Sequence, residues 1–268
     1  MTPNVSVLLQ RWGVADVIGE NLVRFKELNM RRKDGTPIGY TRIAHLEQAL
    51  GRPWWVVHRA HLHEGLATVV KQLGAKIALN ARVVEIDYKD MTQVVVKTFK
   101  GTSHTFNLCV GADGINSIVR RTLFPSIQPE PPTTNCAYRA LVPFERIRKD
   151  PIAKELIKEM TMEVWMAHKS YIITYPINAG HVLNLVLSHH LPEKLRTVQP
   201  NVPIEEMRPE YKDYDERIKR IVDMIPEVVS SRYAQAKWPL ILTYFQSRWP
   251  LMVTGPLESW SSPQKNVV

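Results

Sequence analysis

The residues of greatest chemical interest lie in a glycine-containing turn that follows an apolar segment. Residues 107–111 are mostly apolar, and the sequence Gly-Ala-Asp-Gly occupies residues 111–114. Glycine allows a ligand to approach the backbone closely, and Asp113 could accept a hydrogen bond from a sugar hydroxyl. Ser117 can cap a helix that begins after the turn, and the first N–H groups of such a helix attract phosphate. The pattern is typical of a nucleotide site at the carboxyl edge of a sheet, although an ordinary strand-to-helix turn has the same residues.

Histidines and cysteines provide no convincing metal site. His58 and His61 could share one face of a helix, but His63 would point elsewhere, and no carboxylate completes the ligand set. Cys109 and Cys136 have neither the spacing of a zinc site nor the number needed for a disulfide framework. We therefore expect no bound metal.

The segments that must position these residues predict a mixed α/β chain in two parts. Hydrophobic periodicity and turn residues define the elements, and a proline-rich stretch at 125–132 separates the two parts. The predicted helices cover 5–18, 61–73 and 204–225. The predicted strands cover 76–88, 92–99, 105–110, 136–142, 161–166, 171–175 and 182–188, with further short strands around an Asp-Gly turn at 33–36. The strands after the proline-rich stretch are expected to form an antiparallel sheet.

The composition and charge of the chain indicate which kinds of molecule it could bind. The chain has 268 residues and a formal net charge of +9, but its 35 basic residues are scattered and accompany no nucleic-acid motif. No apolar run reaches the roughly 18 residues of a membrane span, and the N-terminus does not resemble a secretory signal. We expect a cytoplasmic protein that binds no nucleic acid and has no membrane span, with part of its positive charge serving anionic small molecules. The oligomeric state stays open.

Five stretches, in the same order, resemble a known family. Residues 107–120 closely resemble the Asp-Gly motif of the group A flavoprotein monooxygenases, the aromatic hydroxylases of the salicylate hydroxylase and p-hydroxybenzoate hydroxylase type. Residues 58–62 resemble the family's Arg-x-x-Leu stretch, and residues 173–177 resemble its Tyr-Pro strand. Residues 138–139 resemble the tyrosine-arginine pair that enters its substrate domain, and residues 260–268 resemble the approach to its third flavin motif.

The resemblance implies an enzyme that binds FAD, uses NAD(P)H as co-substrate and transfers one oxygen atom of O₂ to a phenolic or aromatic-acid substrate. By this resemblance Arg59 would lie along the FAD, and Asp113 and Gly114 would lie near its pyrophosphate. Arg139 and Tyr175 would face the aromatic ring. Arginine pairs well with a carboxylate, and a tyrosine hydroxyl can bind a phenolic oxygen and help to deprotonate it.

Two family motifs are missing from the sequence. No Gly-x-Gly-x-x-Gly fingerprint follows a strand, and the Gly-Asp motif that grips the flavin would begin where the sequence stops. The resemblance therefore implies a chain truncated at both ends, with impaired FAD binding. Residues 237–243 are nearly repeated at 248–254, which predicts an insertion at 228–246.

Together these observations predict an α/β fold with an incomplete Rossmann-like FAD-binding domain and a second, antiparallel-sheet substrate domain. The expected boundaries are 1–128 for the FAD domain, 129–203 for the substrate sheet, and 204–268 for a helix and a return segment. Two alternatives remain open. The chain could be a catalytically inactive remnant, or it could be a basic module that binds a nucleic acid or a protein.

Overall fold

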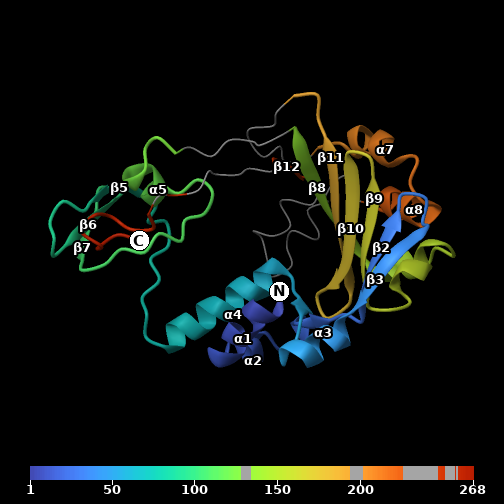
Figure 1. Cartoon of the computed structure of the whole chain (residues 1–268), viewed down its shortest axis with the longest axis horizontal. Helices are drawn as coiled ribbons and strands as arrows, with labels where there is room; N and C mark the ends of the chain where they lie inside the picture. Colours follow the sequence, from blue (N-terminus) through green and yellow to red (C-terminus); the bar gives the residue numbers. More distant parts are fainter. Residues whose placement is uncertain (128–133, 194–201, 226–246, 251–256, 258) are drawn as a thin grey trace. The chain divides into compact units, whose positions relative to one another are not determined.

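The computed structural model divides the chain into two compact units, each built from segments far apart in the sequence (Figure 1). The larger unit comprises Met1–Ala75 and Thr134–Pro250, and the smaller unit comprises Lys76–Thr133 and Leu251–Val268. The structure describes residues 1–127, 134–193, 202–225, 247–250, 257 and 259–268. The predicted insertion at 228–246 lies outside the described residues.

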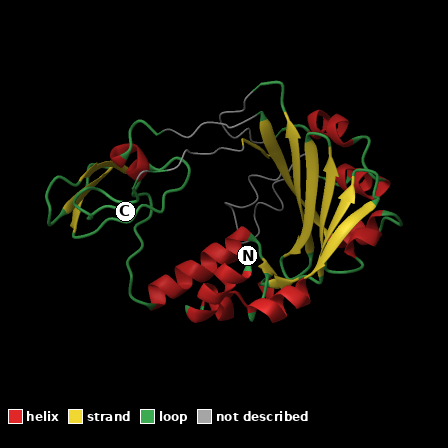
Figure 2. Ribbon diagram, in the orientation of Figure 1, coloured by secondary structure: helices red, strands yellow, loops and turns green. Residues whose placement is uncertain are grey.

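The larger unit is organised around a seven-stranded sheet (Figure 2). Its strands, in spatial order, are β12 (Ser247–Pro250), β8 (Asn135–Pro143), β11 (Val182–His190), β10 (Ser170–Ile177), β9 (Met162–Ala167), β2 (Glu27–Arg32) and β3 (Pro37–Arg42). The antiparallel sheet predicted for residues 136–188 is confirmed by the pairing of β8, β11, β10 and β9. The pair β2–β9 is parallel, so the whole sheet is mixed.

Alternation of side chains along β11 gives the sheet one buried face. Leu183, Leu185 and Leu187 are at most 2% exposed, whereas Val182, Asn184 and Val186 between them are half-buried. Successive residues of a strand point to opposite faces, so the leucines share the core face. Four helical segments contribute to this core: α6 (Phe144–Arg148), the 3₁₀ segment η2 (Ala153–Ile157), α7 (Ile204–Tyr211) and α8 (Glu216–Asp223).

The single helix predicted over 204–225 is two helices, α7 and α8. The break occurs at Asp215, whose side chain caps α8 by accepting a hydrogen bond from the Arg217 N–H at 2.9 Å. The Asp215 N–H donates to the Lys33 carbonyl in the turn between β2 and β3. A Cβ atom at Gly35 of that turn would overlap the Asp215 carboxylate. The break thus follows from a contact with a segment that is distant in the sequence.

A second helical layer of the larger unit carries the N-terminal segment. It contains α1 (Pro3–Arg11), α2 (Val14–Ile18), the 3₁₀ segment η1 (Gly19–Asn21), α3 (Ile43–Leu50) and α4 (Arg59–Gln72), with the short pair β1 (Val23–Arg24) and β4 (Trp55–Val56). The helix predicted over 5–18 is interrupted at Gly13, which has a φ of +71°. A Cβ at Gly65 of α4 would lie 2.6 Å from a side-chain carbon of Ile18, so glycine permits the close packing of α2 and α4.

The described part of the smaller unit contains a three-stranded antiparallel sheet and one short helix. Its elements are β5 (Val83–Asp87), β6 (Val94–Thr98), β7 (Ser103–Phe106) and α5 (Ile118–Leu123). The core combines Ile86, Val94, Val96 and Val119 with Val267 from the C-terminal segment. The strands predicted at 76–88 and 105–110 are shorter than expected. Cys109 instead forms an isolated parallel bridge with Val267.

The compact units differ from the predicted boundary at residues 128 and 129. Residues 1–75 belong to the unit of the large sheet, because β2 extends that sheet beside β9. The amino-acid pattern of neither β2 nor β9 indicates which strand it pairs with, so the sequence could not predict this pairing. None of the described helices is both long enough and apolar enough to cross a membrane.

A buried carboxylate ties β2 to β9. Glu163, which is 6% exposed, accepts hydrogen bonds from Arg31 Nε at 2.7 Å and Asn29 Nδ2 at 2.8 Å. Thr161 Oγ1 also donates to it, at 2.9 Å. Removing one partner of a buried ion pair leaves an uncompensated charge, and this strongly lowers the free energy of unfolding.

Glu163→Gln should therefore lower the free energy of unfolding by about 3 kcal/mol, measured by urea denaturation. The matched control is Glu145→Gln, because Glu145 makes only an exposed ion pair with Lys149. That control should change stability by less than about 0.5 kcal/mol. Equal effects of the two variants would show that Glu163 does not hold β2 in the sheet.

A second buried polar group lies beneath the opposite end of the sheet. The Tyr211 hydroxyl is 3.3 Å from His189 Nδ1, and His189 Nε2 is 3.3 Å from Cys136 Sγ. Burial raises the pKa of Tyr211 well above its ordinary value. The folded chain therefore keeps a proton that the unfolded chain releases near pH ~10.

Stability should fall as the pH rises through and beyond that value, because the unfolded state then binds fewer protons than the folded state. Tyr211→Phe should flatten this slope by up to about 1.4 kcal/mol per pH unit, measured by chemical denaturation between neutral and strongly alkaline pH. Tyr40→Phe removes a tyrosine that is 59% exposed and should leave the slope unchanged. An unaltered slope in Tyr211→Phe would contradict the assignment.

Candidate functional site

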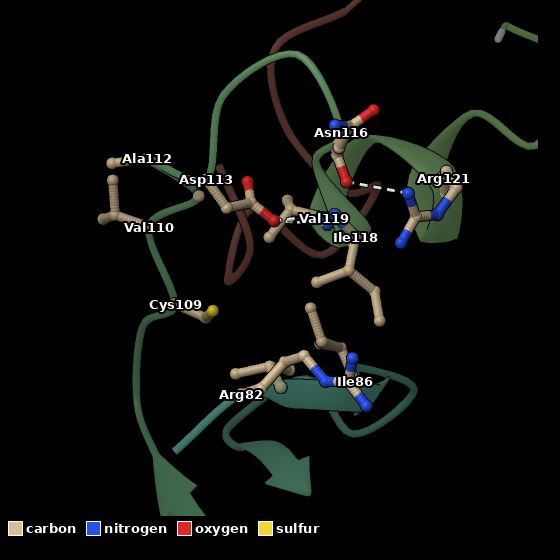
Figure 3. A pocket seen from close by; sticks show the side chains of 12 residues that line it. Arg82, Ile86, Cys109, Val110, Ala112, Asp113, Asn116, Ile118, Val119 and Arg121 are labelled. Atoms are coloured by element: carbon tan, nitrogen blue, oxygen red, sulfur yellow. Dashed lines mark hydrogen bonds between the residues drawn. The ribbon is translucent and has the colours of Figure 1, made fainter. Parts of the chain in front are cut away.

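The Asp113 carboxylate organises the turn that the sequence singles out. Its Oδ1 accepts a hydrogen bond from Ser117 Oγ at 2.5 Å, and its Oδ2 accepts from the backbone N–H of Ile118 at 2.6 Å and of Val119 at 3.3 Å. Ser117 Oγ in turn accepts from the Arg120 N–H at 2.9 Å, which confirms Ser117 as the cap of α5. Figure 3 shows Asp113 directed at the start of this helix.

These contacts change the expected electrostatics of the turn. Limited burial favours a higher pKa for Asp113, but the hydrogen bonds from Ser117 and from the helix N–H groups outweigh it, so the pKa lies below its ordinary value. Asp113 is therefore ionised at neutral pH. The first N–H groups of α5 are satisfied by Asp113 and Ser117, whereas the sequence interpretation left them for a phosphate.

A pocket of about 430 Å³ lies beside this turn within the smaller unit (Figure 3). Its lining combines apolar side chains, among them Ile86 and Ile118, with the turn residues Gly111 and Asp113. Two arginines, Arg82 and Arg121, also line it. A ligand that suits this pocket has both apolar and anionic parts.

Backbone geometry keeps one side of the turn open. Gly114 has a φ of +73°, and a Cβ atom there would meet nothing within 4 Å. A Cβ at Gly111, by contrast, would lie 2.7 Å from side-chain atoms of Val119. Gly111 therefore permits the close packing of α5, and Gly114 provides the conformation of the turn and an exposed stretch of backbone.

The C-terminal segment completes the smaller unit. The Cys109 N–H donates to the Asn266 carbonyl, and the Val268 N–H donates to the Cys109 carbonyl, both at 2.9 Å. The Asn266 side chain, which is 5% exposed, donates to the Asp90 carbonyl at 2.8 Å. Residues 260–268 and the Asp113 turn, which the sequence links only by resemblance, thus belong to one folded unit. Asn266, Arg82 and Arg121 were not among the predicted site residues.

Arg59 lies in the larger unit, at the first residue of α4. The preceding His58 caps this helix, with its Nδ1 accepting a hydrogen bond from the Ala60 N–H at 3.2 Å. Arg59 is exposed, and it follows β4 by three residues. Among the described residues, no group of three or more His, Cys, Asp and Glu side chains could hold a metal ion.

Arg139 and Tyr175 share the face of the large sheet that is opposite the core. Tyr175 of β10 pairs with Asn184 of β11, which pairs with Leu141 of β8, and Arg139 lies two residues before Leu141. Tyr175 also packs against the cluster that contains Val56 of β4. The structure therefore brings Arg139 and Tyr175 to one surface.

The electrostatics of this face follow from that arrangement. Burial raises the pKa of Tyr175, and the positive charge of Arg139 offsets part of the rise. The Tyr175 hydroxyl therefore keeps its proton at neutral pH and can donate a hydrogen bond. Arg139 is exposed and supplies a positive charge beside it.

Comparison with known proteins gives a consistent set of relatives, although no protein-family model matches the sequence. The chain is 29% identical over 238 residues to the FAD-dependent monooxygenase OpS4 of Beauveria bassiana (strain ARSEF 2860), an alignment that covers 85% of this chain and 54% of that protein. It is 26% identical over 215 residues to the hispidin-3-hydroxylase of Neonothopanus nambi, covering 73% and 50% of the two chains. The chain thus spans about half the length of the curated relatives it matches.

Solved structures agree in fold. The crystal structure of CtdE in complex with FAD and its substrate 4 superposes with a TM-score of 0.81 at 15% identity, covering 100% of this chain and 62% of that one. A salicylate hydroxylase substrate complex gives a TM-score of 0.74 at 19% identity, covering 100% and 64%. By sequence the chain is similar to proteins named FAD-dependent monooxygenases and aromatic hydroxylases, and its fold is similar to that of a salicylate hydroxylase.

Proposed function

We propose that the chain acts in the FAD-dependent hydroxylation of a phenolic or aromatic-acid substrate, with NAD(P)H and O₂ as co-substrates. The observation that carries this proposal is the shared sheet face of Arg139 and Tyr175, a guanidinium beside a protonated phenol. The relatives that match this chain include proteins named for hydroxylation of hispidin and of 3-hydroxybenzoate. An aromatic substrate with an acidic oxygen suits both groups on this face.

The residues of the smaller unit fit a dinucleotide in chemistry. FAD combines apolar rings with an anionic pyrophosphate, and the pocket beside Asp113 combines apolar walls with Arg82 and Arg121. The open backbone at Gly114 allows close approach of a ligand. We propose that Asp113 and Gly114 contact the sugar-phosphate part of FAD. The role in FAD binding that the family resemblance implies for Arg59 stays a prediction.

Bound FAD, once reduced by NAD(P)H, supplies the activation of O₂ and the oxygen transfer. The residues of this chain bind and orient the substrate. Arg139 attracts an acidic group of the substrate. Tyr175 donates a hydrogen bond to a phenolic oxygen and stabilises the phenolate, which makes the ring a better nucleophile.

We also propose that the reaction takes place in the cytoplasm and involves no nucleic acid. The use of NAD(P)H supports this location, and no disulfide joins Cys109 to Cys136, as expected in a reducing compartment. The alternative, a catalytically inactive remnant, implies that the chain does not bind flavin. Measurement of flavin binding distinguishes the two.

The purified chain should bind FAD weakly, and Asp113→Ala should weaken binding further by at least 10-fold, because the turn loses the hydrogen bonds that hold it to α5 and the site loses an acceptor for a sugar hydroxyl. Titration of flavin fluorescence measures both affinities. Asp90→Ala is the matched control, since Asp90 lies in the same unit and its carboxylate accepts hydrogen bonds from the Thr92 N–H and hydroxyl, away from the Asp113 turn. Thermal denaturation shows whether each variant is folded. Absence of any flavin binding by the folded wild-type chain would favour the inactive remnant.

Arg139→Gln should weaken binding of an aromatic acid by about 10- to 100-fold, since it removes a charge-assisted hydrogen bond. Calorimetric titration with salicylate measures the effect. Arg146→Gln, on α6, removes the same charge from an exposed position and should leave the affinity unchanged. Similar losses in the two variants would mean that net charge, and not the sheet face, attracts the ligand.

A further inference from the structure

An unsatisfied amide lies on the sheet face that carries Arg139 and Tyr175. Asn184 Nδ2 is buried and has no hydrogen-bond partner among the described residues. A buried donor without an acceptor costs about 1–3 kcal/mol, and native proteins rarely retain one without a reason. The position of Asn184 therefore calls for an explanation beyond stability.

Strand register places this amide beside the two predicted substrate residues. Asn184 of β11 pairs with Tyr175 of β10 on one side and with Leu141 of β8 on the other. Residues paired across neighbouring strands share a face, so the Asn184 and Tyr175 side chains are adjacent. Leu183 and Leu185, which flank Asn184 in the sequence, point to the core.

A positive charge lies in the neighbouring set of paired residues on the same face of the sheet, two positions along each strand. Arg139 pairs with Val186, two residues beyond Asn184, and Val186 pairs with Ile173. The Arg139 charge acts on the Tyr175 hydroxyl, as the pKa of that group shows. The two sets of paired residues contain no acidic residue. A guanidinium, a phenol O–H and an amide N–H thus lie on one face, and each can donate a hydrogen bond to an acidic ligand.

We infer that Asn184 is a specificity-determining residue whose amide donates a hydrogen bond to a carboxylate oxygen of the substrate. The inference rests on the proposed function and narrows it from phenols in general to aromatic acids. The carboxylate would lie between the Arg139 guanidinium and the Asn184 amide, and Tyr175 would remain available to a ring hydroxyl.

A second asparagine shows what a purely structural amide looks like in the same sheet. Asn29 of β2 donates from its Nδ2 to Glu163 at 2.8 Å, on the core face. Its amide is satisfied within the fold, whereas that of Asn184 is not. The two residues therefore form a matched pair for mutagenesis.

Asn184→Leu should weaken the binding of salicylate by about 10-fold or more, while the binding of phenol, which lacks the carboxylate, stays unchanged. Its thermal midpoint should stay the same or rise, because an apolar side chain removes an unsatisfied donor. Asn184→Asp should bind salicylate more weakly still, since it adds a negative charge. Asn29→Leu should show the opposite behaviour, with a lower thermal midpoint and unchanged affinity. Calorimetric titration and thermal denaturation of the full chain measure these effects.

The possible outcomes separate the two proposals. If the wild-type chain binds salicylate and Asn184→Leu binds it equally well, the role of Asn184 is wrong and the proposed function stands. A fall in the thermal midpoint of Asn184→Leu with unchanged affinity would likewise assign it a structural role. If the folded wild-type chain binds neither salicylate nor phenol, the proposed function fails, and the inference fails with it.

Discussion

The register of β8, β11 and β10 is the constraint on which the proposed substrate surface depends. Because side chains alternate between the two faces of a strand, a shift of one residue would exchange the faces. The leucines of β11 would then leave the core, and Arg139 would enter it. Packing of Leu183 and Leu185 against the helices thus also determines where Arg139, Tyr175 and Asn184 meet a ligand. One face of these paired strands packs in the core and stabilises the fold, and the opposite face carries the residues proposed to bind the substrate.

The smaller unit has only a small core, and hydrogen bonds and close packing hold its short helix and its sharp turn in place. Asp113 and Ser117 satisfy the first N–H groups of α5, and Gly111 lets Val119 pack closely on the backbone. The C-terminal segment adds Val267 to the same small core. The Asp113 carboxylate therefore stabilises the fold of the turn. Because it is ionised, it can also accept a hydrogen bond from a donor group of a ligand.

Local patterns in the sequence predicted the strands around Tyr175 and the cap at Ser117, because alternation and capping act over a few residues. They could not predict the break at Asp215, which depends on the Lys33 carbonyl, or the placement of β2 beside β9. Arg139 and Tyr175 were named through family resemblance, and the structure places them on one face. Asn184 was missed, since a single polar residue in an alternating strand does not reveal whether its amide has a partner. Roles in FAD binding for Arg59, Asp113 and Gly114 stay predictions.

The parallel pairing of β2 with β9 has a consequence for how the chain folds during synthesis. Asn29 and Glu163 are 134 residues apart, so a ribosome adding about 10 residues per second needs on the order of ten seconds between them. During that interval β2 and β3 can form a hairpin, but the sheet they join does not yet exist. Assembly of the larger unit must therefore wait for the later strands, and the N-terminal segment is exposed to chaperones and to aggregation until they emerge.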